Sequence, residues 1–158
     1  AGVKDSTIID DTYNSSPVAV REALRTLGEI KTTGRKIAVV GDMLELGEHT
    51  IEAHEAIGKI AAETVDILIT VGNAGKLIAA AARKNGLKPQ FVFEFDSVYE
   101  AGKFLEEMIG GGDLILVKAS QAVRLEKIVK EVMAEPHLAS KLLVRQNKEW
   151  LAKKSLYD

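Results

Sequence analysis

Two hydrophobic patterns alternate along this chain, and each predicts a different element. Short runs of consecutive apolar residues, such as KIAVV and ILITV, indicate strands that are covered on both faces of a sheet. Longer stretches with an apolar residue every three to four positions indicate helices with one buried stripe. The predicted strands are residues 7–9, 36–40, 67–71, 91–93 and 113–117, and the helical stretches that follow them are residues 17–30, 50–63, 74–85, 98–108 and 125–132.

Residues at the ends of these stretches support the helix boundaries. Ser16 is a candidate N-cap, and Pro17 suits the first helical position because its missing N–H would be unpaired there anyway. Ser97 and Glu100 have the capping-box spacing. Gly86 can adopt the left-handed conformation that ends a helix.

Five strand-helix repeats predict right-handed crossovers and a mainly parallel sheet. We therefore expect an α/β fold, a Rossmann-like three-layer sandwich with a sheet of five or six strands. The 158 residues, 46% of them hydrophobic, suit one compact domain, which we place at residues 1–135. Residues 136–158 have less regular apolar spacing and form a predicted helical tail. This tail either packs its leucines and Trp150 on the domain or docks on another domain or subunit.

Composition narrows the function without identifying it. The 21 basic and 23 acidic residues leave a net charge of −2, so no chain-wide field favours nucleic acid or an anionic membrane. Cysteine is absent, which excludes disulfides and thiolate metal sites and fits the reducing cytoplasm. No apolar stretch approaches the roughly 20 residues that span a bilayer. The chain starts Ala-Gly-Val without methionine, as expected of a domain taken from a longer polypeptide.

The candidate chemistry lies in the turn DDTYNSSP, residues 10–17, which follows the first strand. Ligands of open α/β sheets bind beyond the carboxyl ends of the strands. Asp10 or Asp11 could accept hydrogen bonds from ribose hydroxyls or an ammonium group, and Asn14 can donate and accept. Tyr13 either packs or offers a stacking surface. Lys118, after the fifth strand, adds a positive charge at the same edge, unless it simply pairs with an aspartate of the turn.

Other chemistries find less support. The sequence has neither G-x-G-x-x-G nor G-x-x-x-x-G-K-[ST], so no phosphate-binding loop is predicted. His49 and His54 are five positions apart and do not share a helical face well, so no metal site is predicted. Residue type and spacing suggest no Ser-His-Asp arrangement, so no catalytic residue is predicted either. A phospho-receiver or stand-alone binding module is the alternative, because Asp10, Asp11 and Lys118 fit a receiver's outline. The third strand, ILITVGNAG, lacks the aspartate that a receiver phosphorylates.

Four segments carry a family resemblance. DDTYNSSP, VVGDMLELGEHT, ILITVG and LILVKASQAVRLEKIV resemble, in order and spacing, the carboxyl-terminal domain of the Mur ligases across residues 8–132. Within that family, GDMLELGE with DDTYN is similar to the member that uses D-alanyl-D-alanine. The equivalent domain of another Mur ligase or of a folylpolyglutamate ligase is the alternative.

The resemblance implies an ATP-dependent amide ligase of peptidoglycan synthesis, and hence a role in cell-wall biogenesis, cell shape and cell division. Such an enzyme joins D-alanyl-D-alanine to UDP-N-acetylmuramoyl-tripeptide through an acyl phosphate. ATP and Mg²⁺ would bind mainly to a central domain, and the UDP-sugar to an amino-terminal domain. Neither domain is present here, so the chain alone is predicted to be inactive.

The resemblance also assigns residues. It implies nucleotide contacts for Asp11, with Asp10 beside it, and for Tyr13. It implies contacts to the amino substrate from Asn14, Ser16, Asp42, Lys118 and Ser120. The family more often has Asn-Ala-Asn-Pro at residues 14–17 and an arginine where this chain has Gln121. Arg124 is the expected replacement for that arginine, unless Lys118 suffices.

Overall fold

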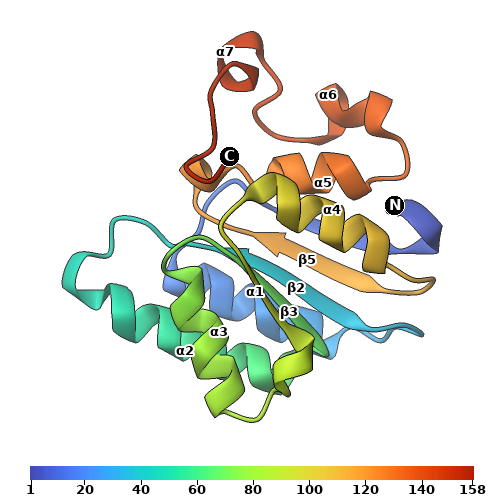
Figure 1. Cartoon of the computed structure of the whole chain (residues 1–158). Helices are drawn as coiled ribbons and strands as arrows, with labels where there is room; N and C mark the ends of the chain where they lie inside the picture. The colour runs from blue at the N-terminus through green and yellow to red at the C-terminus, as the bar shows by residue number, and fades with distance from the viewer.

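The structure, a computed structural model, describes residues 1–158 as a five-stranded, all-parallel sheet between two layers of helices (Figure 1). This confirms the predicted three-layer α/β fold. No helix has the length and the apolar character needed to cross a membrane. The strands are β1 (Thr7–Asp11), β2 (Lys36–Gly41), β3 (Ile67–Val71), β4 (Val92–Phe95) and β5 (Leu114–Lys118). The main helices are α1 (Pro17–Glu29), α2 (Thr50–Thr64), α3 (Gly75–Lys84), α4 (Val98–Met108) and α5 (Glu126–Val132).

The strand order is β1-β5-β2-β3-β4, so the last strand inserts between the first two. Alternate residues of the strands enter two separate cores. Ala38, Val40 and Leu68 pack under α1, α2 and α3, whereas Ile37 and Val39 pack under α4 and α5. Burial on both faces explains why these strands are continuous apolar runs in the sequence.

Only β3 has the predicted bounds: β2 ends one residue later than predicted, β5 is shifted by one residue so that Lys118 is its last residue, and β1 and β4 differ by more. Asp10 and Asp11, expected in a turn, are the last residues of β1, because they pair with Val117 and Lys118 of β5. β4 begins at Val92, one residue later than expected, because Phe91 belongs to a 3₁₀ turn that starts at Pro89. The predicted N-cap of α1 is present, since Ser16 accepts a hydrogen bond from the Ala19 N–H. The predicted capping box is half formed: Ser97 accepts a hydrogen bond from the Glu100 N–H, but the Glu100 carboxylate accepts none from the Ser97 N–H.

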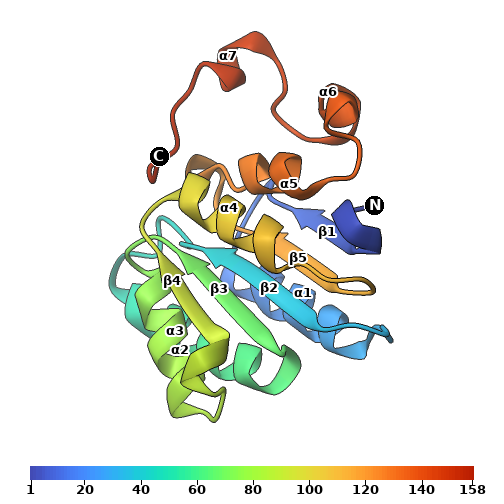
Figure 2. The same cartoon turned by 45° about the vertical axis from the view of Figure 1, so that its right-hand side comes forward.

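Residues 136–158, called the tail from here on, are less helical than predicted. They contain one 3₁₀ turn (Pro136–Leu138) and two four-residue α-helices, α6 (Ala139–Leu142) and α7 (Lys148–Leu151), within an arch that passes above α5 (Figures 1 and 2). Leu143 packs on the core, but Leu142 and Leu151 are exposed. Polar contacts to backbone carbonyls hold the tail in place, and these are invisible to a hydrophobic pattern.

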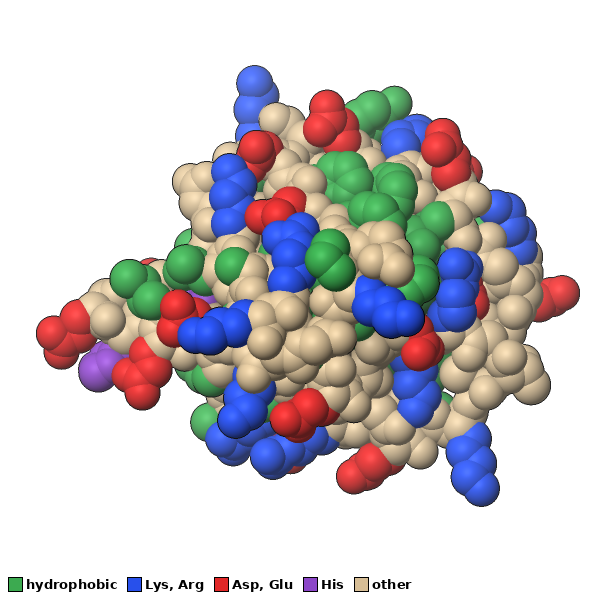
Figure 3. Space-filling view, turned by 60° about the horizontal axis from the view of Figure 1, so that its bottom comes forward, with side chains coloured by type: hydrophobic (Ala, Val, Ile, Leu, Met, Phe, Trp, Pro, Cys, Tyr) green, Lys and Arg blue, Asp and Glu red, His purple; other side chains and the backbone are tan.

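Charged side chains of both signs are interspersed on the face shown in Figure 3. Neither sign gathers there into one broad patch. This distribution fits the nearly balanced composition. This face therefore offers a ligand no broad field of one sign.

Candidate functional site

A buried ion pair fixes the turn after β1 to β5. The Lys118 Nζ atom lies 2.7 Å from Asp11 Oδ2 and donates a second 2.7 Å hydrogen bond to the Asn14 carbonyl oxygen. The lysine side chain is 1% exposed, whereas the Asp11 side chain is 43% exposed. Lys118 therefore fixes the turn from the protein interior. Asp11 is the member of the pair that a ligand can reach.

Polar side chains of the turn also shape its backbone. Asp10 Oδ1 accepts hydrogen bonds from the Thr12 N–H (3.2 Å) and the Thr12 hydroxyl (2.7 Å), which form an Asx-type turn. Asn14 Oδ1 accepts from the Ser15 N–H at 2.9 Å, and Ser16 caps α1. The Asn14 amide nitrogen has no partner within the chain, so it is a free donor of this turn.

Asp42, which follows β2, is 3% exposed and uses both oxygens within the protein. Its Oδ1 accepts from the Gly75 N–H at 2.9 Å, and its Oδ2 accepts from the Tyr157 hydroxyl of the tail. The pKa of the Tyr157 hydroxyl is raised above its ordinary value, mainly by burial and secondly by this hydrogen bond to Asp42. Gly72 makes room for the contact, because a Cβ there would come within 2.6 Å of Asp42 Oδ1 and of the Tyr157 ring.

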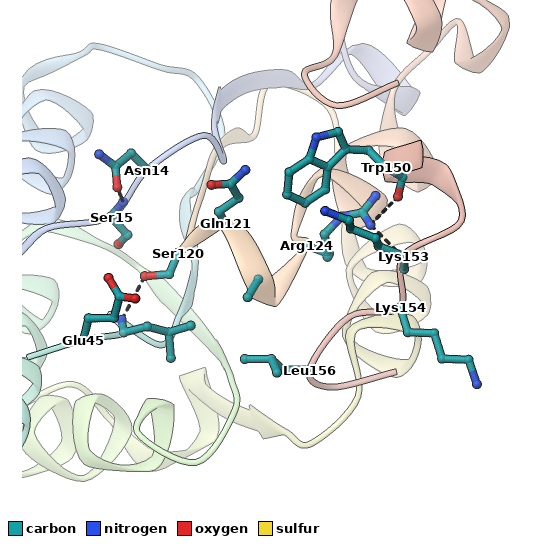
Figure 4. A pocket seen from close by; sticks show the side chains of 12 residues that line it. Asn14, Ser15, Glu45, Ser120, Gln121, Arg124, Trp150, Lys153, Lys154 and Leu156 are labelled. Atoms are coloured by element: carbon teal, nitrogen blue, oxygen red, sulfur yellow. Dashed lines mark hydrogen bonds between the residues drawn. The ribbon is translucent and has the colours of Figure 1, made fainter. Parts of the chain in front are cut away.

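A cavity of about 450 Å³ opens where the loops after β2 and β5 separate. These strands are neighbours, but their following helices α2 and α5 lie on opposite faces of the sheet. This divergence produces the crevice in which open α/β sheets bind ligands. Figure 4 shows Asn14, Ser15, Glu45 and Ser120 on one side of the cavity and Arg124, Trp150 and Lys153 on the other.

The polar groups of the cavity include one buried group without a partner. Ser15 is 6% exposed, and its Oγ makes no hydrogen bond. Ser120 Oγ accepts from the Leu44 N–H at 2.9 Å, which joins the loops after β2 and β5. Buried hydroxyls are almost always hydrogen-bonded, so the Ser15 hydroxyl is a candidate ligand contact.

Arg124 anchors the tail to the loop after β5. Its side chain is 2% exposed, and its Nε donates to Glu126. Its Nη1 donates to the carbonyl oxygens of Trp150 (2.6 Å) and Lys153 (2.8 Å). The expected substrate contact of Arg124 stays a prediction, since the hydrogen bonds that the structure gives it go to the protein.

Arg145 makes the second attachment of the tail. Its guanidinium donates to the Tyr13 carbonyl oxygen and, at 2.8 Å, to the Thr12 carbonyl oxygen. It also lies 5.0 Å from the centre of the exposed Tyr13 ring. Burial lowers the pKa of Arg145 from its ordinary value, although the nearby Glu126 opposes that shift. The tail is thus bonded directly to the turn that the sequence singled out.

The residues predicted from the sequence differ in their position relative to the cavity. Of the residues predicted to form the site, the cavity is lined by Asn14, Ser120 and Arg124, whereas Asp11 and Lys118 lie beside it under the same turn. Asp10, Ser16 and Asp42 have roles in the protein's own hydrogen bonding. Sequence reasoning missed the lining residues Ser15, Leu44, Glu45, Trp150, Lys153, Lys154 and Leu156. The lone tryptophan among lysines was the available signal for the tail residues.

The family profile and similar curated proteins both point to the Mur ligases. The profile of the family described as "Mur ligase, glutamate ligase domain" matches residues 1–121. The UDP-N-acetylmuramoyl-tripeptide–D-alanyl-D-alanine ligase of Bacillus subtilis is 35% identical over 131 residues, which are 82% of this chain and 28% of that protein. The chain therefore spans less than a third of the length of this curated relative.

Solved structures agree with the sequence matches. The crystal structure of MurF ligase from Thermotoga maritima in complex with ADP aligns with a TM-score of 0.66 and 31% identity, covering 81% of this chain and 28% of that one. MurF from Acinetobacter baumannii aligns with a TM-score of 0.68 and 26% identity, covering 82% and 29% respectively. The chain belongs to the Mur ligase family, in which it corresponds to the carboxyl-terminal domain.

Proposed function

We propose that this chain is the lobe of an ATP-dependent ligase that presents D-alanyl-D-alanine for joining to UDP-N-acetylmuramoyl-tripeptide. The names of the relatives support the substrates, and the MurF structure with ADP supports the nucleotide. The observation that carries the proposal for this chain is the cavity at the carboxyl edge. Its volume of about 450 Å³ falls in the usual range for small-ligand sites, and groups of opposite charge line it.

The amino substrate would occupy this cavity. Its peptide carbonyl can accept a hydrogen bond from the free Asn14 amide, and the Ser15 hydroxyl supplies a further donor or acceptor. Orientation of the attacking amine toward an activated carboxylate is the contribution expected of such a lobe, because positioning lowers the entropic cost of reaction. The acyl phosphate that this amine would attack forms on the other domains of the enzyme.

In this proposal the chain would contact the nucleotide only through its ribose. One Asp11 oxygen pairs with Lys118, which leaves the other oxygen of this half-exposed carboxylate free to accept from a ribose hydroxyl. The chain has no cluster of three carboxylate or imidazole groups suited to Mg²⁺. The phosphates and Mg²⁺ are accordingly assigned to the rest of the enzyme.

The phospho-receiver alternative gains no support from the structure. β3 ends at Val71 and continues into Gly72 and Asn73, so no carboxylate lies where a receiver is phosphorylated. Incubation with acetyl phosphate tests this alternative directly. A stable aspartyl phosphate on the chain would favour signalling over ligation.

Steady-state kinetics of the full-length enzyme test the proposal. Asn14→Asp keeps the acceptor for the Ser15 N–H but removes the amide donor, so it should raise the KM for the dipeptide about tenfold without changing that for ATP. Asp11→Ala should raise the KM for ATP instead. The matched control is Gln90→Ala, an exposed amide before β4 at the opposite edge of the sheet.

Three outcomes would count against the proposal. The first is unchanged KM values for both substrates in Asn14→Asp and Asp11→Ala. The second is phosphate release by the 158-residue chain alone, in step with amide formation, when it is given ATP, Mg²⁺ and both substrates. A wild-type enzyme that makes no product from the dipeptide would refute the assigned substrate.

A further inference from the structure

Three cations surround one aromatic ring of the tail beside the cavity: Arg145 and Lys153 from the tail itself, and Arg124 from the loop after β5. The Trp150 ring centre lies 5.5 Å from the Arg124 guanidinium carbon, 5.4 Å from that of Arg145 and 3.9 Å from Lys153 Nζ. One buried carboxylate, Glu126, compensates this group: it pairs with Arg124 and lies 4.0 Å from Arg145 Nη1, and neither of its oxygens forms an ion pair with Lys153. The cluster therefore has an excess of positive charge at the wall of the cavity, which favours an anionic ligand group.

Lys153 is the cation of this cluster that remains available. Arg124 is occupied by Glu126 and two carbonyl oxygens, and Arg145 is occupied by the turn after β1. None of the ion pairs in the chain includes Lys153. Figure 4 shows its side chain running below the Trp150 ring toward Gln121, while Lys154 points away from the cavity.

The backbone of the tail fixes Lys153 in this position. Arg124 donates to the carbonyl oxygens of both Trp150 and Lys153, so one buried guanidinium sets the end of α7 against the cavity. The Trp150 ring then braces the lysine through a cation–π contact, which reduces the conformational freedom lost on binding. Lys118 cannot take this part, because it is 1% exposed and both of its contacts are internal.

The opposite side of the cavity carries the complementary charge. Glu45 is the acidic residue among the twelve that line it, and Figure 4 places it beside Ser120, across from Lys153. A cavity with an acid at one end and a cation at the other matches a small zwitterion. The amino group of such a ligand would face the Glu45 side and its carboxylate the tail.

We propose that Lys153, braced by Trp150, binds the carboxylate of the amino substrate, and that the tail thereby completes the site. This inference rests on the proposed function. It assigns to the tail the cationic contact that Gln121, an uncharged residue on the loop after β5, cannot make. Arg124 becomes a positioning residue, since it acts through the backbone of Trp150 and Lys153.

The test compares two substrates of the full-length enzyme. D-Alanyl-D-alanine carries the carboxylate, and its carboxyl-terminal amide keeps the amine but lacks the negative charge. Lys153→Met should raise the KM for the dipeptide about tenfold, because it removes a charge-assisted hydrogen bond, and should leave the KM for the amide unchanged. Lys153→Arg should restore most of the affinity for the dipeptide. The KM for ATP should stay constant throughout.

The matched control is Lys148→Met, which removes a charge from an exposed lysine of the same tail that does not line the cavity. It should behave as wild type with both substrates. The inference is overturned if Lys153→Met leaves the KM for the dipeptide unchanged, or raises the KM values for dipeptide and amide equally. A wild-type enzyme that ignores the dipeptide would refute the proposed function itself, so the two failures are distinguishable.

Discussion

The Asp11–Lys118 pair provides the sharpest prediction about stability, because its two members differ so much in burial. Asp11→Asn leaves the ammonium group of Lys118, 1% exposed, with no opposite charge. Lys118→Met removes the buried charge and keeps most of the side-chain volume. The carboxylate that it leaves behind is 43% exposed and can be hydrated.

The two substitutions should therefore have unequal costs. Breaking a buried ion pair from one side typically costs 3–5 kcal/mol, and the partial exposure of Asp11 places Asp11→Asn at the lower end, about 3 kcal/mol. Lys118→Met loses two hydrogen bonds but avoids the desolvation of an ammonium group, so we expect a cost of about 1 kcal/mol. The double variant should resemble Lys118→Met, which implies a coupling energy of about 3 kcal/mol.

Urea unfolding of the 158-residue chain at neutral pH measures these differences, provided that the slope of free energy against urea is the same in each variant. Lys59→Met, an exposed lysine of α2, is the control and should be neutral. The reasoning is refuted if Asp11→Asn costs no more than Lys118→Met. It is equally refuted if the costs of the two single substitutions add up in the double variant.

Three further predictions concern the tail and the pH dependence of stability. Tyr157→Phe should lower the free energy of unfolding by about 1–2 kcal/mol, because it removes a hydrogen-bond donor to buried Asp42. The wild-type chain should lose the same contribution as pH rises through the raised pKa of Tyr157, and urea unfolding at alkaline pH would measure this loss. Burial acts to raise the pKa of Asp113, but hydrogen bonds from Arg35 and Gly110 lower it overall, so its contribution is present at neutral pH and lost as pH falls through the folded-state pKa. Asp113→Asn should therefore flatten the stability profile below about pH 4, the ordinary pKa of an aspartate. Arg145→Met should cost about 1–3 kcal/mol and shift the fluorescence of the single tryptophan to the red, whereas an unchanged emission spectrum would show that the guanidinium does not hold the tail.

Local sequence signals identified most elements, because each depends on neighbouring residues. The run ILITV predicts β3 with its observed bounds, and Ser16-Pro17 predicts the start of α1. The prediction failed by a few residues where pairing between distant strands sets the boundary. Asp10 and Asp11 look like turn residues in isolation, but their register with β5 makes them part of a strand.

The sequence by itself determined the alternation of strands and helices, and hence a parallel sheet whose carboxyl edge gathers Asp11, Asn14 and Lys118. Only the tertiary structure decided which of these groups remain accessible. Lys118 is buried and internally bonded, while the tail places Trp150 and Lys153 across the cavity from Asn14 and Glu45, which are more than 100 residues earlier in the chain. No periodicity encodes that approach, because it depends on single hydrogen bonds from Arg124 and Arg145 to carbonyl oxygens that are distant in sequence.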